Sequence, residues 1–276
     1  MKGSPLHIDF EKLWKEGMHN WHGEMPERMI DDALEEAFWS QSMQKKSYRQ
    51  TDAHTKPIYE KMRKHIPDNA TCLEIGPGWG NYTFPLREDV EKLTLVDGSE
   101  SVLQYLQQYF VGDEGVQYIR AKWEDAEVEQ HDVVMGVNCY YRIYEMNEAL
   151  LKMNDLAKKR VIIGLTTGPI QPHYVVLDQH YGYQIKYPRR DYIGIVNMLY
   201  QLGIYADCEM LPLERTYRYD TYEALYTAQS KKILNDTFQI EDVKAALANF
   251  ITEENGEIVY RHKFYAAIIS WEPVKL

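Results

Sequence analysis

Three glycines closely follow an acidic residue in the first third of the chain. Residues 73–80 read Leu-Glu-Ile-Gly-Pro-Gly-Trp-Gly, which places Glu74 ahead of Gly76, Gly78 and Gly80. This spacing differs from the GxGxxG pattern of dinucleotide sites. Glycines so close together let the backbone turn tightly and approach a ligand without a clash at Cβ. A carboxylate within the turn would repel a diphosphate and attract an ammonium group.

A second acidic residue stands 97 − 74 = 23 residues further on, where Asp97 is followed by Gly98 and Ser99. The preceding run, Lys-Leu-Thr-Leu-Val, is typical of a buried strand. An acid at the end of a second parallel strand can accept hydrogen bonds from both hydroxyls of a ribose. The pair of motifs therefore indicates a nucleoside site that also attracts positive charge.

The two motifs together resemble those of the class I S-adenosylmethionine-dependent methyltransferases, over a core of about residues 71–165. The resemblance implies S-adenosyl-L-methionine as the cofactor. Glu74 would be the motif acid, Gly76, Gly78 and Gly80 the glycine loop, and Asp97 the ribose acid, with Gly98 and Ser99 beside it. Two alternatives stay open: a non-catalytic, regulatory protein that binds the donor, and a nucleotide- or NAD-binding Rossmann enzyme.

Two further strand ends carry candidate residues. After the third strand, the resemblance implies an adenine contact, for which Trp123 offers a stacking face and Glu124 an acceptor; the alternative is an exposed acidic turn with a half-buried tryptophan. After the fourth strand, Asn138 would face the donor, and Tyr140 and Tyr141 are candidate catalytic residues beside the reacting methyl group. The prolines of the amino-methyltransferase motif Asn-Pro-Pro-Tyr are absent, so the segment does not define that subclass. The alternative is that a tyrosine here packs in the core.

Further candidates lie outside these motifs. We predict that Thr166 after the fifth strand, and Trp39, Tyr48 and Arg49 in an aromatic, polar N-terminal segment, bind the substrate. His173 is a candidate general base, with a structural histidine as the alternative. His19 and His22 have no evident third ligand, so we predict no metal site.

Short apolar runs alternate with helical stretches from residue 71 onward, which predicts an α/β fold with a doubly wound, mostly parallel, seven-stranded sheet. The runs expected to form strands are 71–75, 92–97, 116–119, 132–137, 160–165, 204–212 and 264–271. The stretches expected to form helices between them are 81–89, 99–110, 145–157 and 190–202.

Two additions to this core are expected. Residues 1–68 form a helical N-terminal cap ahead of a methyltransferase domain at 69–276, and a helical insertion occupies about 217–262. Within the cap, Ile30, Leu34 and Phe38, together with Ala33 and Ala37, have the spacing of a buried helical face. Residues 38–52 show no clear period and predict a loop or broken helix.

Composition limits the partners. The 276 residues hold 31 Lys and Arg against 42 Asp and Glu, a net charge of −11, which argues against nucleic-acid and membrane binding and for a small-molecule acceptor. The three cysteines form no framework, and the N-terminus lacks the apolar stretch of a signal peptide. We therefore expect a cytoplasmic enzyme; the oligomeric state stays open.

Overall fold

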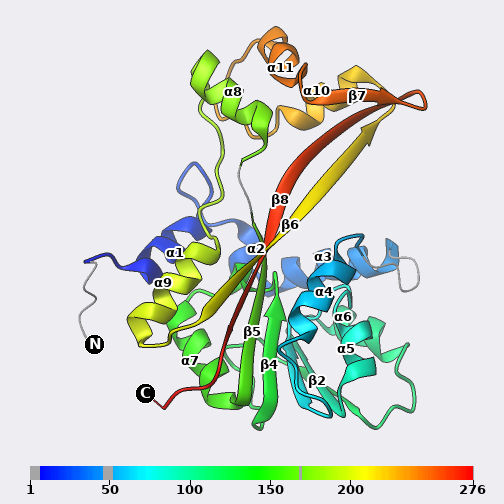
Figure 1. The fold of residues 1–276 in the computed structure, drawn as a ribbon, viewed down its shortest axis with the longest axis vertical. Coiled ribbons are helices and arrows are strands. Elements are labelled where there is room, and N and C mark those ends of the chain that lie inside the picture. Colours follow the sequence, from blue (N-terminus) through cyan, green and yellow to red (C-terminus); the bar gives the residue numbers. More distant parts are fainter. Residues whose placement is uncertain (1–6, 46–51, 168–169, 276) are drawn as a thin grey trace. The chain divides into compact units, whose positions relative to one another are not determined.

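The computed structural model describes residues 7–45, 52–167 and 170–275. It divides into two compact units. The first consists of residues 1–165, 189–211 and 267–276, and the second of residues 166–188 and 212–266. Figure 1 shows the elements of both.

The first unit is built on a sheet in the order β3-β2-β1-β4-β5-β8-β6. Its first five strands are parallel neighbours: β1 (Thr71–Ile75), β2 (Lys92–Asp97), β3 (Val116–Arg120), β4 (His131–Val137) and β5 (Ala157–Thr167). Ile75 is in register with both Val96 and Gly136, so β1, β2 and β4 end at one edge of the sheet. This arrangement confirms the predicted α/β fold and brings the loops after these strands together.

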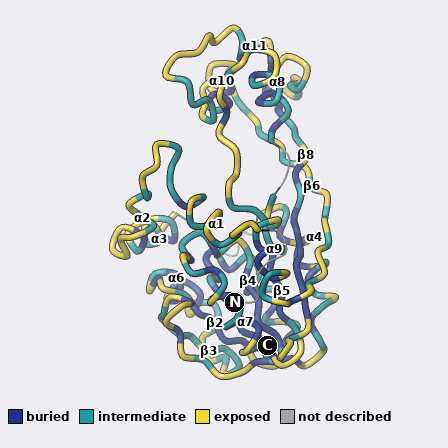
Figure 2. The backbone as a smooth tube through the Cα atoms, turned by 90° about the vertical axis from the view of Figure 1, so that its left-hand side faces the viewer, coloured by how far each residue is buried: buried dark blue, intermediate teal, exposed yellow. Residues whose placement is uncertain are grey.

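Helices cover both faces of this sheet (Figure 1). One face carries α5 (Thr83–Asp89) and α6 (Glu100–Gln107), which contact β2. The other carries α7 (Met146–Leu156), which contacts β4, with α9 (Tyr192–Leu202) and α1 (Phe10–Met18) packed against α7. Figure 2 shows that buried residues concentrate along the strands. The strands are thus enclosed on both faces, which explains their nearly continuous apolar sequences.

The N-terminal segment is helical, with α2 (Glu27–Ile30), α3 (Asp32–Lys45) and α4 (Thr55–Arg63) following α1. Two expectations about it are wrong. The helix α3 continues without a break to Lys45, inside a stretch expected to be a loop or broken helix. The predicted apolar face is exposed: Ile30 is 71% accessible, and Leu34 and Phe38 are exposed as well. The side chains that α3 buries are instead Glu35 and Met43, and the Glu35 carboxylate accepts hydrogen bonds from Arg28 on α2 and from Tyr141 after β4.

The second unit contains α8 (Pro172–Tyr181), α10 (Tyr222–Gln229), α11 (Ile240–Leu247), β7 (Ile251–Glu254) and the adjoining parts of β6 (Asp207–Tyr219) and β8 (Glu257–Trp271). It has its own hydrophobic cluster around Tyr174, Leu225, Leu247 and Tyr260. The insertion expected at 217–262 is helical only at its centre. Both flanking strands extend into it, and β7, which pairs antiparallel with β8, was not expected.

Candidate functional site

The loop after β1 has the backbone that its glycines predict. Gly76, Gly78 and Gly80 have φ values of +60°, +50° and +72°, a region that side chains with a Cβ rarely adopt. At Gly76, an added Cβ would lie 2.5 Å from the Cβ of Cys139, which follows β4. The glycines are therefore required both by conformation and by the close approach of the β4 loop.

Glu74 lies on β1 just before this loop and is 2% exposed. Its carboxylate accepts a hydrogen bond from the Thr83 hydroxyl at 2.7 Å, which ties the end of β1 to the start of α5. Burial raises the pKa of Glu74 to about 7, and the nearby Asp97 charge adds to the rise, while the Thr83 hydrogen bond opposes it. A cationic ligand would stabilise the ionised form of this buried carboxylate.

The loop after β2 carries Asp97, Gly98 and Ser99. The Asp97 carboxylate accepts a hydrogen bond from the Ser99 backbone N–H at 2.8 Å, and the Ser99 hydroxyl caps α6 by accepting from the Val102 N–H at 3.3 Å. Burial raises the pKa of Asp97 to about 6, opposed by the backbone N–H groups of Ser99 and Gly78. The same edge of the sheet therefore holds two carboxylates that both lack a cationic partner among the groups that shift their pKa values.

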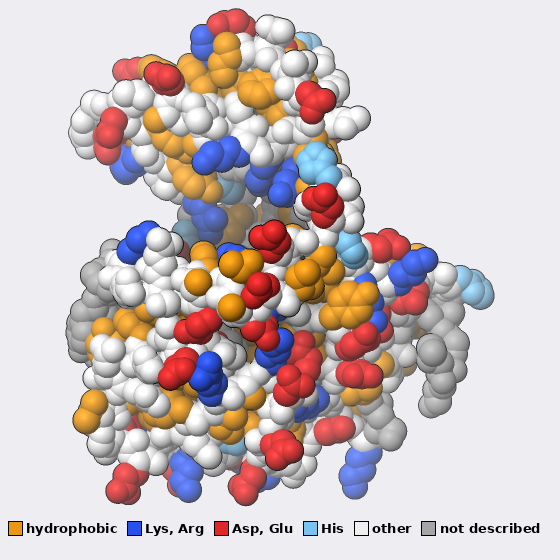
Figure 3. All heavy atoms as spheres, turned by 180° about the vertical axis from the view of Figure 1, so that it is seen from behind, with side chains coloured by type: hydrophobic (Ala, Val, Ile, Leu, Met, Phe, Trp, Pro, Cys, Tyr) orange, Lys and Arg blue, Asp and Glu red, His pale blue; other side chains and the backbone are white. Residues whose placement is uncertain are grey.

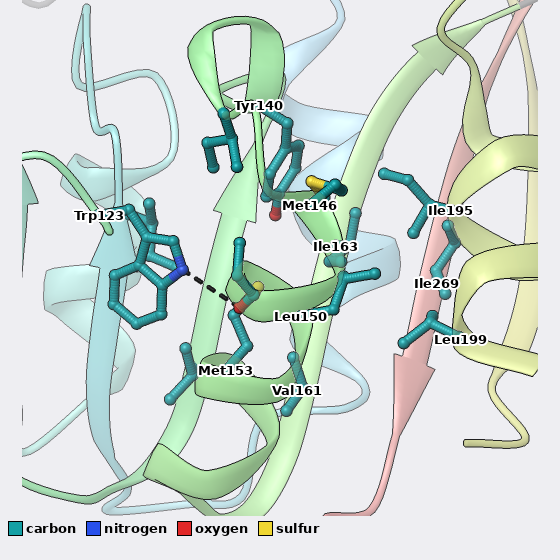
Figure 4. Close-up of a cluster of buried hydrophobic side chains, with 14 of the residues drawn as sticks. Trp123, Tyr140, Met146, Leu150, Met153, Val161, Ile163, Ile195, Leu199 and Ile269 are labelled. Carbon is teal, nitrogen blue, oxygen red and sulfur yellow. Dashed lines mark hydrogen bonds between the residues drawn. The ribbon is translucent and has the colours of Figure 1, made fainter. Parts of the chain in front are cut away.

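The loop after β3 corrects one prediction. Trp123 lies in the hydrophobic core, where its indole N–H donates to the Ala149 carbonyl at 3.2 Å and the Lys152 ammonium lies 4.8 Å from its ring (Figure 4). An indole held there by α7 fills the core, so the structure does not support Trp123 as an adenine stacker. Glu124 beside it is exposed.

The loop after β4 brings Asn138, Tyr140 and Tyr141 to the same edge. Asn138 has a φ of +54°, which an Asn tolerates, and its N–H donates to the Gly164 carbonyl at 2.9 Å. Tyr140 is a core residue (Figure 4), since its hydroxyl donates to the Gly136 carbonyl at 2.8 Å and its ring is buried. The prediction of a catalytic Tyr140 is therefore corrected, and Tyr141 is the tyrosine of this loop that reaches other functional groups.

Tyr141 meets helix α3 at a buried carboxylate. Its hydroxyl donates a short hydrogen bond to Glu35, which is 5% exposed, and accepts one from the Trp39 indole N–H at 3.3 Å. Trp39 also donates to Glu35 at 2.9 Å, and Arg28 pairs with the same carboxylate at 2.8 Å. Burial, followed by the Glu35 hydrogen bond, raises the pKa of the Tyr141 hydroxyl well above its ordinary value. We call Arg28, Glu35, Trp39 and Tyr141 the lid network.

The lid network lies on the glycine loop. A Cβ added at Gly78 would lie 3.2 Å from the Trp39 ring, and Trp39 meets the Trp79 ring edge-on with a centroid distance of 5.7 Å. The next residue of α3, Glu36, accepts hydrogen bonds from the Ser101 hydroxyl at 2.6 Å and its N–H at 3.1 Å, at the start of α6. Helix α3 thus spans the loops after β1, β2 and β4.

The sequence did not single out Glu35, Glu36 or Arg28. A signal was present, because Glu35, Trp39 and Met43 stand at i, i+4 and i+8 and form a stripe on one helix face. The more apolar stripe beside it suggested the wrong face.

The remaining candidates belong to the second unit or lie outside the described residues. His173, in the second unit, is fully buried and both its ring nitrogens are engaged, with the Tyr260 hydroxyl at 2.8 Å and the Gln229 carbonyl at 3.1 Å. Burial lowers its pKa to about 4. The prediction of a general base is corrected: His173 is a structural residue. Thr166 is exposed at the end of β5, in the second unit, and Tyr48 and Arg49 lie outside the described residues.

Two features are absent from the described residues. Within residues 7–45, 52–167 and 170–275, no group of three or more His, Cys, Asp or Glu side chains is arranged to hold a metal ion. Over the same ranges, no helix has both the length and the apolar character needed to cross a membrane.

Comparisons with known proteins agree with this geometry. Residues 73–163 match the family model of a methyltransferase domain. A candidate methyltransferase from Bacillus halodurans C-125 superposes with a TM-score of 0.53 at 13% identity, covering 80% of this chain and 100% of that one. The YcgJ protein from Bacillus subtilis gives 0.52 at 14% identity, covering 82% and 100%. Among proteins of curated function, none matches the sequence.

Residues 73–163 match a methyltransferase domain, and Glu74, the three glycines and Asp97 all lie within this range. The solved structures share the fold around it.

Proposed function

We propose that the protein transfers the methyl group of S-adenosylmethionine to a small-molecule acceptor. The observation that carries this proposal is the contact of helix α3 with the glycine loop through Trp39 and Gly78. A helix that spans three ligand-binding loops encloses the space above them, which suits a small acceptor better than a polymer. The net charge of −11 also disfavours a nucleic-acid acceptor.

The residues at the sheet edge fit the donor. Glycines with positive φ leave the backbone bare of Cβ atoms. The buried Glu74 and the partly buried Asp97 have no cation among the groups that shift their pKa values, and an ammonium or sulfonium group would supply one. We propose that Asp97 holds the ribose of the donor, with Gly98 and Ser99 beside it. Glu74 and the glycine loop hold the amino-acid end of the donor, and Asn138 lines the same edge of the sheet. The exposed Glu124 accepts a hydrogen bond from the adenine amine.

The donor, when bound, supplies a methyl group already activated by a sulfonium. The chain then needs chiefly to position the acceptor atom in line with the carbon–sulfur bond and to exclude water. Tyr141 and Trp39 are suited to both tasks, because the lid network fixes their polar atoms while their rings cover the glycine loop. Tyr141 acts here as a positioning residue, since its hydroxyl holds its proton at neutral pH.

The experiment combines calorimetry with label transfer. We expect S-adenosylhomocysteine to release binding heat on titration and NAD to release none. With methyl-labelled donor and a cell extract separated by ultrafiltration, we expect the label in the small-molecule fraction.

Each alternative has its own outcome. Binding without any transfer would identify a non-catalytic donor-binding protein, and preference for NAD would identify a different Rossmann enzyme. Label arriving chiefly in RNA or protein would contradict the proposed acceptor class while preserving the methyltransferase activity.

A further inference from the structure

In the second unit, the neighbouring strands β6 and β8 form a ribbon, and its two faces differ in how their arginines are paired. On one face, Arg218 pairs with Glu257 at 2.9 Å, and Arg261 forms a bidentate pair with Glu254, with one N–O distance of 2.7 Å. Because side chains alternate along a strand, Arg215 on β6 and His262 on β8 belong to the opposite face. There, no carboxylate among the described residues forms an ion pair with Arg215.

Two lysines join this second face. Lys186 and Lys232 lie close enough to each other to interact electrostatically, and Arg215 acts on Lys232 as well. Burial lowers the pKa of Lys232, and the neighbouring positive charges of Lys186 and Arg215 lower it further. Neither lysine forms an ion pair within the part of the chain that the structure describes. Figure 3 shows Lys, Arg and His side chains on the surface of this unit. In a chain with 42 acidic and 31 basic residues, such a cluster without carboxylates is unexpected.

Aromatic rings accompany the cations. Tyr217 and His262 stack with a centroid distance of 5.8 Å and an interplanar angle of 19°, and the Arg215 guanidinium lies 4.7 Å from the Phe264 ring centre. The Lys232 ammonium lies 5.5 Å from the Tyr174 ring centre. Cation–π contacts stabilise these positive charges in part, but they provide no counter-charge.

A buried nitrogen on this face is also unsatisfied. His262 Nδ1 lies 3.1 Å from the Lys263 carbonyl oxygen, whereas the buried Nε2 has no hydrogen-bond partner among the described residues. A buried polar atom without a partner lowers stability unless a ligand or water satisfies it.

We propose that this face of the second unit, formed by Lys186, Arg215, Tyr217, Lys232 and His262, binds a small organic anion. The ligand carries a carboxylate or phosphate next to a flat, apolar ring. The anion supplies the missing counter-charge for Arg215 and Lys232, which can form charge-assisted hydrogen bonds to it. The ring continues the stack that Tyr217 and His262 begin. This site does not depend on donor binding, so it can be tested apart from the proposed function.

The test uses phenyl phosphate, benzoate, phenol and inorganic phosphate as probes, each titrated into the full chain and followed by NMR. We expect saturable binding of phenyl phosphate and benzoate, with a Kd of about 1 mM or lower, and binding at least about tenfold weaker for phenol and inorganic phosphate. The double variant Arg215→Gln, Lys232→Gln should weaken phenyl phosphate binding about tenfold or more. Arg218→Gln, on the carboxylate-paired face, should leave it unchanged.

Three results would overturn the proposal. They are the absence of saturable binding for both anionic rings, unchanged phenyl phosphate affinity in the double variant, and binding of an oligonucleotide in place of the small anions. Circular dichroism and binding of S-adenosylhomocysteine verify that each variant is folded. If the double variant fails this check, the single variants Arg215→Gln and Lys232→Gln replace it, each with an expected loss of about threefold.

Discussion

Both units of the molecule hold charges that their own side chains do not balance, and the charges have opposite sign. In the first unit, burial raises the pKa values of Glu74 and Asp97, and no cation among the groups that influence them lowers these values. In the second unit, burial and neighbouring cations lower the pKa values of Lys232 and His262. A ligand of opposite charge would shift the pKa of each group back towards its ordinary value, because it favours the charged form.

The difference between the two regions lies in how the charge is presented. The carboxylates stand at the ends of parallel strands, beside a glycine loop whose backbone leaves room for a ligand. Of the cations, Arg215 stands on β6 beside the Phe264 ring, and Lys232 lies in a turn beside the Tyr174 ring. The first arrangement suits a nucleoside with a cationic end, and the second suits a flat anion. One chain thus offers two sites of complementary chemistry.

The largest effect is expected at the ribose acid. Replacing Asp97 by Asn keeps the shape of the side chain but removes the charge, and we expect donor affinity to fall about 10- to 100-fold, the scale of losing hydrogen bonds to a charged group. Calorimetry with S-adenosylhomocysteine measures the change. Asp113→Asn, which removes a carboxylate paired with Arg87 of α5, is the matched control and should bind normally. Equal affinity for both variants would remove Asp97 from the donor site.

A smaller effect is expected when the lid network loses only the Tyr141 hydroxyl. Tyr141→Phe removes one hydrogen bond to Glu35, but the carboxylate keeps those from Trp39 and Arg28. We therefore expect a loss in kcat/KM of about three- to tenfold, and a loss of about 100-fold for Tyr141→Ala, which removes the ring as well. Tyr144→Phe, at an exposed tyrosine nearby, is the control.

The Phe and Ala variants distinguish two roles for Tyr141. Positioning requires that the pH profile of Tyr141→Phe match that of the native protein. If Tyr141→Phe lowers kcat/KM as much as Tyr141→Ala, or if one pH-dependent transition disappears from its activity profile, then Tyr141 transfers a proton and its assignment as a positioning residue is wrong.

The sequence predicted the first unit better than the second, and physical reasons explain this. The strands β1 to β5 and the glycine loop are local patterns, since burial on both faces requires continuous apolar residues and a positive φ requires glycine. The lid network is not local. It depends on a contact between Glu35 and Tyr141, 106 residues apart, and the apolar stripe of α3 pointed to a different face. His173 and Tyr140 looked available for chemistry because a sequence does not reveal that a core hydrogen bond occupies a polar group.

The smallest effect concerns Glu74 and tests whether its charge is unbalanced in the donor-free protein. Its pKa of about 7 lies above the ordinary value of 4.5, so between these pH values the folded state binds more protons than the unfolded state. The free energy of unfolding therefore falls as pH rises through this window, because deprotonation favours the unfolded chain. Buried histidines act in the opposite direction, so the quantity to measure is the difference between the native protein and Glu74→Gln. At pH 5 the two should differ little, whereas at pH 8 the variant should be the more stable by about 1–3 kcal/mol, measured by denaturant unfolding.

The control Glu88→Gln, at an exposed position on α5, should follow the native protein at both pH values. A stability difference between native protein and Glu74→Gln that does not change with pH would mean that folding leaves the pKa of Glu74 unshifted, and a native protein that gains stability over the variant as pH rises would mean that a cation already pairs with Glu74; either result would remove the contrast between the two units.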